Sequence, residues 1–102
     1  MPSQELTVKD DPTELRYEAL REGELVAEIR YLTEPGVVVL VHTEVNPSEE
    51  GSGLGSLLVR AALDDIRERG LHVVPVCPFV AAYIRRHPEY ADLVIRNPVT
   101  RG

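Results

Sequence analysis

Residues 37–77 read VVVLVHTEVNPSEEGSGLGSLLVRAALDDIRERGLHVVPVC, which is the pattern of a strand, a helix and a second strand. The stretch 37–45 is rich in β-branched residues and begins with an apolar run, as is typical of a strand covered on both faces. Apolar residues then recur at helical spacing from Leu54 to Ile66, and Gly70 marks the expected end of the helix. Residues 71–76 predict a short second strand. Such a unit predicts two parallel strands joined by a right-handed crossover.

The residues before this unit predict an antiparallel meander. Apolar and charged side chains alternate over residues 15–19 and 25–31, as expected for strands with one buried and one exposed face. Residues 21–24 predict the turn between these strands, and Pro35–Gly36 predicts the turn into the strand at 37–45. Residues 1–14 are polar and predict a loose lead-in, with at most a short strand at Leu6–Val8.

The residues after the crossover predict a C-terminal helix. Pro78 suits the first turn of a helix, Pro88 ends it, and residues 91–94 predict a last turn or strand. The predicted fold is therefore α+β, with a mixed sheet: an antiparallel meander followed by one β-α-β crossover and a C-terminal helix. We expect a single compact domain over residues 15–102, because the chain of 102 residues leaves no room for a second one.

The composition excludes several classes of function. The chain has 17 acidic and 11 basic residues, a net charge of −6, which argues against a nucleic-acid partner. Its longest apolar stretch, Val37–Val41, is far shorter than a membrane span of ~20 residues, and the N-terminus lacks the features of a signal peptide. We expect a cytoplasmic protein without a membrane partner. Cys77 is the single cysteine, so it predicts neither an internal disulfide nor a structural metal site.

Residues 47–56, PSEEGSGLGS, form a glycine-rich turn between the first strand and the helix. Such a turn leaves backbone N–H groups free at the positive end of a helix dipole, where phosphate or diphosphate binds. The loop matches neither a Walker A motif nor a dinucleotide fingerprint. Two interpretations stay open: an anion site, or a tight turn that only packs the helix on the strand. Glu49 and Glu50 count against the first.

Four residues are candidates for chemistry. Cys77 precedes the helix that begins at Pro78, a position that favours thiolate, although a lone cysteine is also a common small core residue. His42 lies near the carboxyl end of the strand at 37–45, and ligands of open α/β sheets bind at that end. We therefore expect His42 and Cys77 to converge as base and nucleophile or base and proton donor, with Glu44 to orient His42 or act as base. Tyr83 is either a proton donor or a core residue.

The sequence resembles the GNAT superfamily of N-acetyltransferases, and within it the compact YjdJ-like branch, over about residues 15–94. The segments that carry this resemblance are VHTEV at 41–45, EGSGLG at 50–55, VPVCPF at 74–79 and YIRRHPEY at 83–90. The superfamily loop is usually written Gln/Arg-x-x-Gly-x-Gly/Ala. Gly53 and Gly55 match that pattern, whereas Glu50 stands where the superfamily has Gln or Arg.

The resemblance implies a GNAT-like acyl-CoA N-acyltransferase fold and transfer of an acetyl group from acetyl-CoA, without a metal, to a primary amine. It implies that the loop amides hold the diphosphate, that the pantetheine arm pairs with the strand near residues 43–45, and that His42 and Cys77 lie near the thioester. The implied cofactor-binding residues are Thr43, Val45, Gly51, Ser52, Gly53, Leu54, Gly55, Ser56, Pro78 and Phe79.

The resemblance leaves the acceptor and the chemical route open. The acceptor amine is a small molecule, a polyamine, or a protein lysine or N-terminus, and the net charge of −6 favours a cationic one. Cys77 either protonates the departing thiolate or accepts the acetyl group first, and Tyr83 is the alternative acid. Two rivals remain: a CoA-binding module without turnover, and an unrelated α/β domain with an inert glycine turn. The oligomeric state is not predicted.

Overall fold

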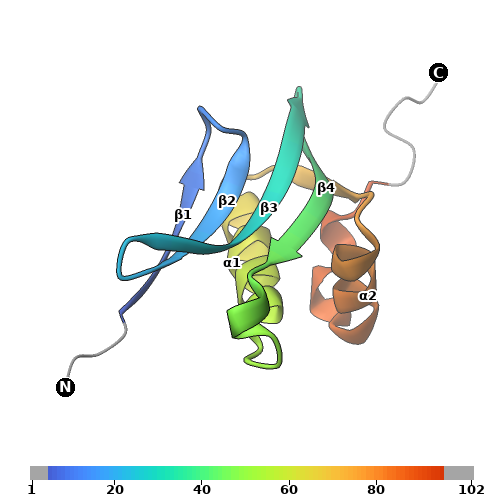
Figure 1. Cartoon of the computed structure of the whole chain (residues 1–102). Coiled ribbons are helices and arrows are strands. Elements are labelled where there is room, and N and C mark those ends of the chain that lie inside the picture. Colours follow the sequence, from blue (N-terminus) through green and yellow to red (C-terminus); the bar gives the residue numbers. More distant parts are fainter. Residues whose placement is uncertain (1–4, 96–102) are drawn as a thin grey trace.

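The computed structural model describes residues 5–95, which form a five-stranded sheet with two helices on one face (Figure 1). The elements are β1 (Leu6–Asp11), β2 (Arg16–Arg21), β3 (Glu24–Glu34), β4 (Val37–Val45), η1 (Pro47–Glu49), α1 (Leu54–Glu68), β5 (His72–Pro75), α2 (Pro78–Arg86) and η2 (Pro88–Leu93). The strand order is β1-β2-β3-β4-β5, antiparallel up to β4 and parallel between β4 and β5. The predicted meander, crossover and C-terminal helix are confirmed.

The core lies between the sheet and the helices. Its largest fully buried members are apolar side chains from strands and helices alike: Ile29, Leu40, Leu58, Val59, Leu63, Ile66, Val73 and Val80. The helical spacing of the apolar residues in α1 brings one side of that helix onto the sheet, while its charged residues face outward. Burial of this continuous cluster is the main term that stabilises the fold.

The loose lead-in expected for residues 1–14 does not hold for residues 6–11, which form β1 and pair with β2 along the whole strand. Tertiary contacts explain the difference. The hydroxyl of Tyr31 donates to Asp10 at 2.6 Å, and Arg69, the C-cap residue of α1, donates to the same carboxylate at 2.8 Å. A polar segment is thus held in the sheet by partners far away in the sequence. The domain boundary itself stays a prediction, and residues 1–4 and 96–102 lie outside the described chain.

The C-terminal residues form a turn and then touch the sheet edge. The 3₁₀ helix η2 ends at Leu93, and Val94 forms an isolated parallel bridge to Val73 on β5. The turn predicted for residues 91–94 is therefore confirmed, whereas the alternative of a strand is reduced to one bridge residue. None of the helices within residues 5–95 has the length and apolar character that crossing a bilayer requires.

A β-bulge in β4 sets the direction of the side chains that follow it. Arg30 of β3 pairs with His42, but the next residue, Tyr31, pairs with Leu40, so Val41 is left without a partner in the ladder. Because side chains alternate along a strand, one extra residue reverses the faces of everything beyond it. Leu40 points into the core, yet His42, two residues on, is exposed and Thr43 is turned inward.

Three tyrosines predict that the fold loses stability at high pH. Burial is the main cause that raises the pKa values of Tyr17, Tyr31 and Tyr90. Their hydrogen bonds, to Asp65, Asp10 and Asp64 respectively, raise these values further, and the pKa of Tyr90 reaches about 12. The unfolded phenols ionise near pH 10, before the folded ones, so the stabilisation is complete below pH 10 and is lost as pH rises toward the folded values. We expect the free energy of unfolding, measured by urea titration, to fall steadily above pH 10. A constant value up to pH 12 would contradict this expectation.

Candidate functional site

The glycine-rich loop presents free backbone donors at the start of α1. Within the described chain, the N–H groups of Gly53, Gly55 and Ser56 have no hydrogen-bond acceptor, while that of Leu54 bonds the Ser52 hydroxyl at 3.2 Å. These N–H groups lie at the positive end of the dipole of a 15-residue helix. The arrangement is suited to a phosphate group, which is one of the two interpretations that the sequence leaves open.

Two glycines of the loop are required by its geometry. Gly53 is the residue before α1 and has φ +82°, a conformation that residues with a Cβ rarely adopt. A Cβ on Gly55 would lie 3.0 Å from the Phe79 ring and 3.4 Å from Val45, so the absence of a side chain lets α1 pack against α2 and β4 here. The loop therefore combines the geometry of a tight turn with backbone N–H groups that have no acceptor in the described chain.

The acidic residues of the loop oppose anion binding less than the sequence suggests. Both Nε and Nη2 of Arg21 bond the Glu49 carboxylate, at 2.9 and 3.0 Å. This bidentate ion pair offsets the charge of Glu49. Glu50 is exposed and carries the negative charge that remains at the loop. Arg21 is distant in the sequence, and no sequence pattern assigned it to this loop.

A pocket of about 260 Å³ adjoins the free amides. Its walls come from the end of β4, the loop and the start of α2: Val45, Glu49, Glu50, Gly51, Gly53, Leu54, Gly55, Ser56 and Phe79. Seven of the ten residues predicted to bind the cofactor line this pocket. Of the other three, Pro78 directly precedes the lining residue Phe79, and Thr43 contacts Cys77. The remaining one, Ser52, caps Leu54 within the loop.

The pairing between strands β4 and β5 ends at Leu40. Their ladder ends with the pair Leu40–Pro75, and the N–H of Cys77 makes a last bond to the Leu40 carbonyl at 2.9 Å. Past that point no described strand pairs with β4 on the β5 side, although β4 continues to Val45. The edge of β4 over residues 41–45 is thus open on the β5 side, between the glycine loop and Cys77.

Cys77 faces this opening from the start of α2. It is buried, it is the N-cap residue of α2, and its sulfur lies 3.3 Å from the Thr43 hydroxyl. Burial raises the pKa of the thiol, but the Thr43 side chain and the backbone of Val80, Phe79 and Thr43 together outweigh that effect and leave the pKa below its ordinary value. The thiol is therefore a packed side chain that ionises more readily than an ordinary cysteine.

His42 and Glu44 lie together on the other face of β4. Nε2 of His42 is 3.7 Å from Oε1 of Glu44, and both side chains are more than half exposed. The expected convergence of His42 with Cys77 is not found: among residues 5–95 no hydrogen bond joins them, and Cys77 contacts Thr43 instead. The bulge at Val41 is the reason, since it turns Thr43 toward Cys77 and His42 away.

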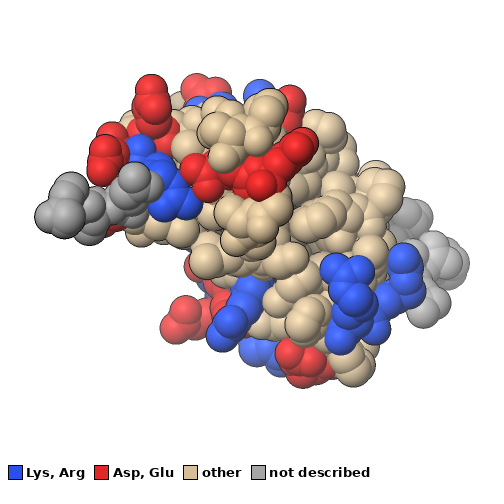
Figure 2. All heavy atoms as spheres, turned by 60° about the horizontal axis from the view of Figure 1, so that its bottom comes forward, with Lys and Arg blue, Asp and Glu red and all other residues tan. Residues whose placement is uncertain are grey.

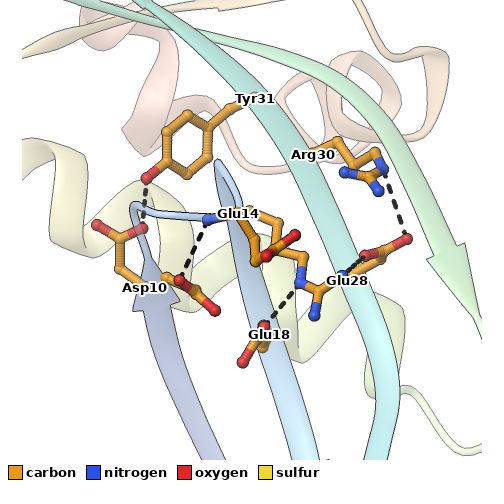
Figure 3. A network of polar contacts seen from close by, with 8 residues as sticks. Asp10, Glu14, Glu18, Glu28, Arg30 and Tyr31 are labelled. Atoms are coloured by element: carbon orange, nitrogen blue, oxygen red, sulfur yellow. Dashed lines mark hydrogen bonds and ion pairs between the residues drawn. The ribbon is translucent and has the colours of Figure 1, made fainter.

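Charged side chains of β2 and β3 form a network of ion pairs (Figure 3). Arg16 bonds both Glu18 and Glu28, at 2.6 and 3.2 Å, and Glu28 also lies 3.7 Å from Arg30. In the ladder, Glu44 stands opposite Glu28 and His42 stands opposite Arg30. Sequence analysis did not assign these neighbours to the site, although the alternating charges of β2 and β3 were visible there.

Tyr83 lies apart from both groups. It is buried between α2 and η2, where its ring stacks on His87 with centroids 4.1 Å apart. Because an α-helix rises about 1.5 Å per residue, Tyr83 is roughly 9 Å along α2 from Cys77. Its role as the alternative acid stays a prediction that this placement does not favour. In the described residues no cluster of three or more His, Cys, Asp or Glu side chains is arranged to hold a metal ion.

The fold is that of known acetyltransferases. A GCN5-like protein from Staphylococcus aureus superposes with a TM-score of 0.67 at 24% identity, over 93% of this chain and 91% of the other. A GNAT family acetyltransferase from Brucella melitensis, solved with acetyl-CoA, gives a TM-score of 0.55 at 23% identity, over 74% of this chain and 54% of that one. The ribosomal-protein-S18-alanine N-acetyltransferase of Escherichia coli gives 0.54 at 22%, over 58% of this chain and 39% of the enzyme.

These three likenesses establish the fold, and the chain spans only about half or less of the last two relatives. A comparison with curated proteins finds no match. The family follows from a separate finding, because the model of the GCN5-related N-acetyl-transferase family matches residues 16–93. The assignment to the YjdJ-like branch stays a prediction. Since the matched region runs from β2 to the end of η2, the chain belongs to the GCN5-related N-acetyltransferase family and has its fold.

Proposed function

We propose that this chain binds acetyl-CoA and transfers its acetyl group to a primary amine. The observation that carries the proposal is the set of free N–H groups of Gly53, Gly55 and Ser56, which border a pocket at the positive end of α1. Acetyl-CoA is the acetyl donor expected of a member of this family. Its diphosphate is the anion that these amides would hold.

The open edge of β4 supports a path for the rest of the carrier. The pantetheine arm carries amide groups, and the edge beyond Leu40 has no strand partner on the β5 side within the described chain. Its amides would pair with the backbone of residues 43–45, in the manner of an added strand. This path leads from the glycine loop to Thr43 and Cys77.

The base and the proton donor of this reaction would lie on opposite faces of β4. His42 and Glu44 are exposed on the open face, where an amine from solution can reach them, and His42 takes the proton that the amine loses as it attacks the thioester carbon. A backbone N–H of β4 stabilises the oxyanion. When the carbon–sulfur bond breaks, Cys77 returns a proton to the CoA thiolate from the other face.

A covalent route uses the same residues in another order. The Cys77 thiolate attacks the thioester carbon, CoA leaves as its thiolate, and the amine then takes the acetyl group from the Cys77 sulfur. The lowered pKa of Cys77 favours the thiolate that this route needs. Mass spectrometry after mixing with acetyl-CoA alone separates the routes, because only the covalent one gives an acetyl adduct on Cys77.

The proposal is tested by calorimetric titration with CoA, followed by a thiol-release assay with acetyl-CoA and a panel of amines. The panel contains small monoamines, polyamines, and peptides with a free N-terminus or a lysine. Binding together with amine-dependent release supports the acetyltransferase, and the amine that works identifies the acceptor class. Binding without release by any amine indicates a CoA-binding module instead, and no binding at all overturns both.

A further inference from the structure

A second pocket of about 260 Å³ lies against β3 and β4, apart from the pocket at the glycine loop. Its walls are residues 25–28 of β3 and residues 44–47, which end β4 and begin η1. The two stretches run side by side in the sheet, because Glu28 pairs with Glu44 in the antiparallel ladder. We call this cavity the β3–β4 pocket.

The β3–β4 pocket adjoins both parts of the proposed chemistry. Glu44 in its wall lies 3.7 Å from Nε2 of His42, the proposed base. Val45 lines this pocket and also the pocket at the glycine loop, so the two cavities meet at the end of β4. An amine held in the β3–β4 pocket would therefore lie next to the base and close to the carrier's path along residues 43–45.

The β3–β4 pocket has a polar end and an apolar end. Glu28 and Glu44 lie opposite each other at the polar end, and Leu25 and Pro47 mark the apolar one. Three steps along the strand separate Glu28 from Leu25, a length of roughly 10 Å. The wall residues between the two ends are mostly apolar: Val26, Ala27, Val45 and Asn46. The pocket is thus shaped for a ligand with one polar group and an apolar chain.

One charge at the polar end is left unbalanced in the described chain. The ion-pair network of Figure 3 sets Arg16 and Arg30 against Glu18 and Glu28, so its charges cancel. The one ionic neighbour of Glu44 within residues 5–95 is the proposed base, which must be uncharged in order to accept a proton. A single ammonium group therefore neutralises this end, and a second cation would meet no unpaired carboxylate among the wall residues.

The net charge of −6 does not change this local balance. On the face shown in Figure 2, acidic side chains form several separate groups with basic ones beside them, rather than one continuous patch. The attraction that such a surface exerts on cations is general, and salt screens it beyond about 8 Å in physiological buffer. The charges that line the pocket therefore decide how many positive groups an acceptor can carry.

We infer that the β3–β4 pocket binds the acceptor, and that the acceptor is a small primary monoamine with an apolar chain rather than a polyamine. The inference rests on the proposed function, because it takes His42 as the base. Glu44 attracts the ammonium group, and the chain lies along the apolar walls. The ammonium first releases one proton to water, and the neutral amine then attacks the thioester. A volume of about 260 Å³ is below the roughly 300–1,000 Å³ of pockets for drug-sized ligands, which suits a chain of a few carbons.

The test compares pentylamine with 1,5-diaminopentane, which carry the same chain and differ by a second ammonium group at its far end. Thiol release by the full chain at saturating acetyl-CoA gives kcat/KM for each amine. We expect pentylamine to have the higher kcat/KM by at least ~10-fold, because the second charge of the diamine would lie against apolar side chains. A diamine that reacts as well as the monoamine overturns the inference.

A change of specificity locates the pocket. Leu25 is 39% exposed, so the strand tolerates a polar residue there. Leu25→Asp places a carboxylate at the apolar end and should raise kcat/KM for the diamine relative to pentylamine by about 3- to 5-fold, as expected for a partly exposed ion pair. Leu25→Asn has nearly the same shape without the charge and should not favour the diamine. Leu32→Asp puts the same charge on another exposed leucine of β3, outside this pocket, and should leave the ratio unaltered.

Failure of the inference differs from failure of the proposed function. If Leu32→Asp changes the ratio as much as Leu25→Asp, the effect is general electrostatics and the pocket is not the acceptor site. Release with peptides but not with pentylamine overturns the inference and leaves the acetyltransferase intact. If no amine gives release above the background hydrolysis of acetyl-CoA, the proposed function itself fails. Thermal melting establishes that each variant is folded before the rates are compared.

Discussion

Gly53→Asp should abolish measurable binding of CoA. Gly53 has φ +82°, and nothing lies within 4 Å of the position that a Cβ would take, so the substitution creates no clash in the protein. It places a carboxylate beside the free N–H groups that would hold the diphosphate. Two like charges a few ångströms apart at a partly desolvated site oppose each other by several kcal/mol, on the order of a 1000-fold loss or more in affinity. Calorimetric titration measures the effect directly.

Two further variants separate charge from backbone strain. Gly53→Asn has nearly the same shape without the charge, and asparagine tolerates the left-handed conformation, so we expect it to keep affinity within about tenfold. Gly70→Asp introduces the same residue at φ +73° near the other end of α1 and should cost stability without weakening CoA binding. If Gly53→Asp bound CoA as well as Gly53→Asn does, the loop amides would not be the diphosphate site.

His42→Ala should lower kcat for acetyl transfer by about 100-fold or more while the dissociation constant for acetyl-CoA stays unchanged. A positioned general base typically contributes a factor of ~10² to 10⁴, and His42 lies on the face of β4 away from the proposed path of the carrier. Glu44→Gln should have a smaller effect if Glu44 only orients His42. The measurement is thiol release under saturating amine and acetyl-CoA.

His72→Ala is the control for this prediction. His72 is also an exposed histidine on a strand, but it begins β5 at the far end from the glycine loop. Its replacement should leave kcat unaltered. Equal kcat values for His42→Ala and the wild type would show that the amine is deprotonated elsewhere, with Glu44 the next residue to test.

Much of the fold could be predicted because its signals are local. The apolar run of β4, the helical spacing in α1 and the proline at the start of α2 each depend on neighbours within a few residues, and each element was found at or near its predicted place. The glycine loop was predictable for the same reason. Gly53 and Gly55 encode in the chain itself a left-handed residue and a close helix contact.

The site was only partly predictable, because its side chains come from distant segments. The bond of Arg21 to Glu49 spans β2 and η1, and the contact between Thr43 and Cys77 joins β4 to α2. Strand β1 is longer than the short strand predicted at Leu6–Val8 for a similar reason, since its polar Asp10 is held by Tyr31 and Arg69. A pattern of hydrophobic and polar residues reports which face is buried, but it does not report which partner a charge will find.

The sequence by itself determined the strand–helix–strand unit and its free amides, because hydrophobic spacing and glycine conformation act locally. The tertiary structure alone decided which side of β4 each candidate residue faces. Period-two alternation continued from Leu40 would have turned His42 inward, toward the helices and Cys77. The bulge at Val41 exists only in the pairing of β4 with β3, and that one extra residue puts His42 on the open face and Thr43 against the thiol.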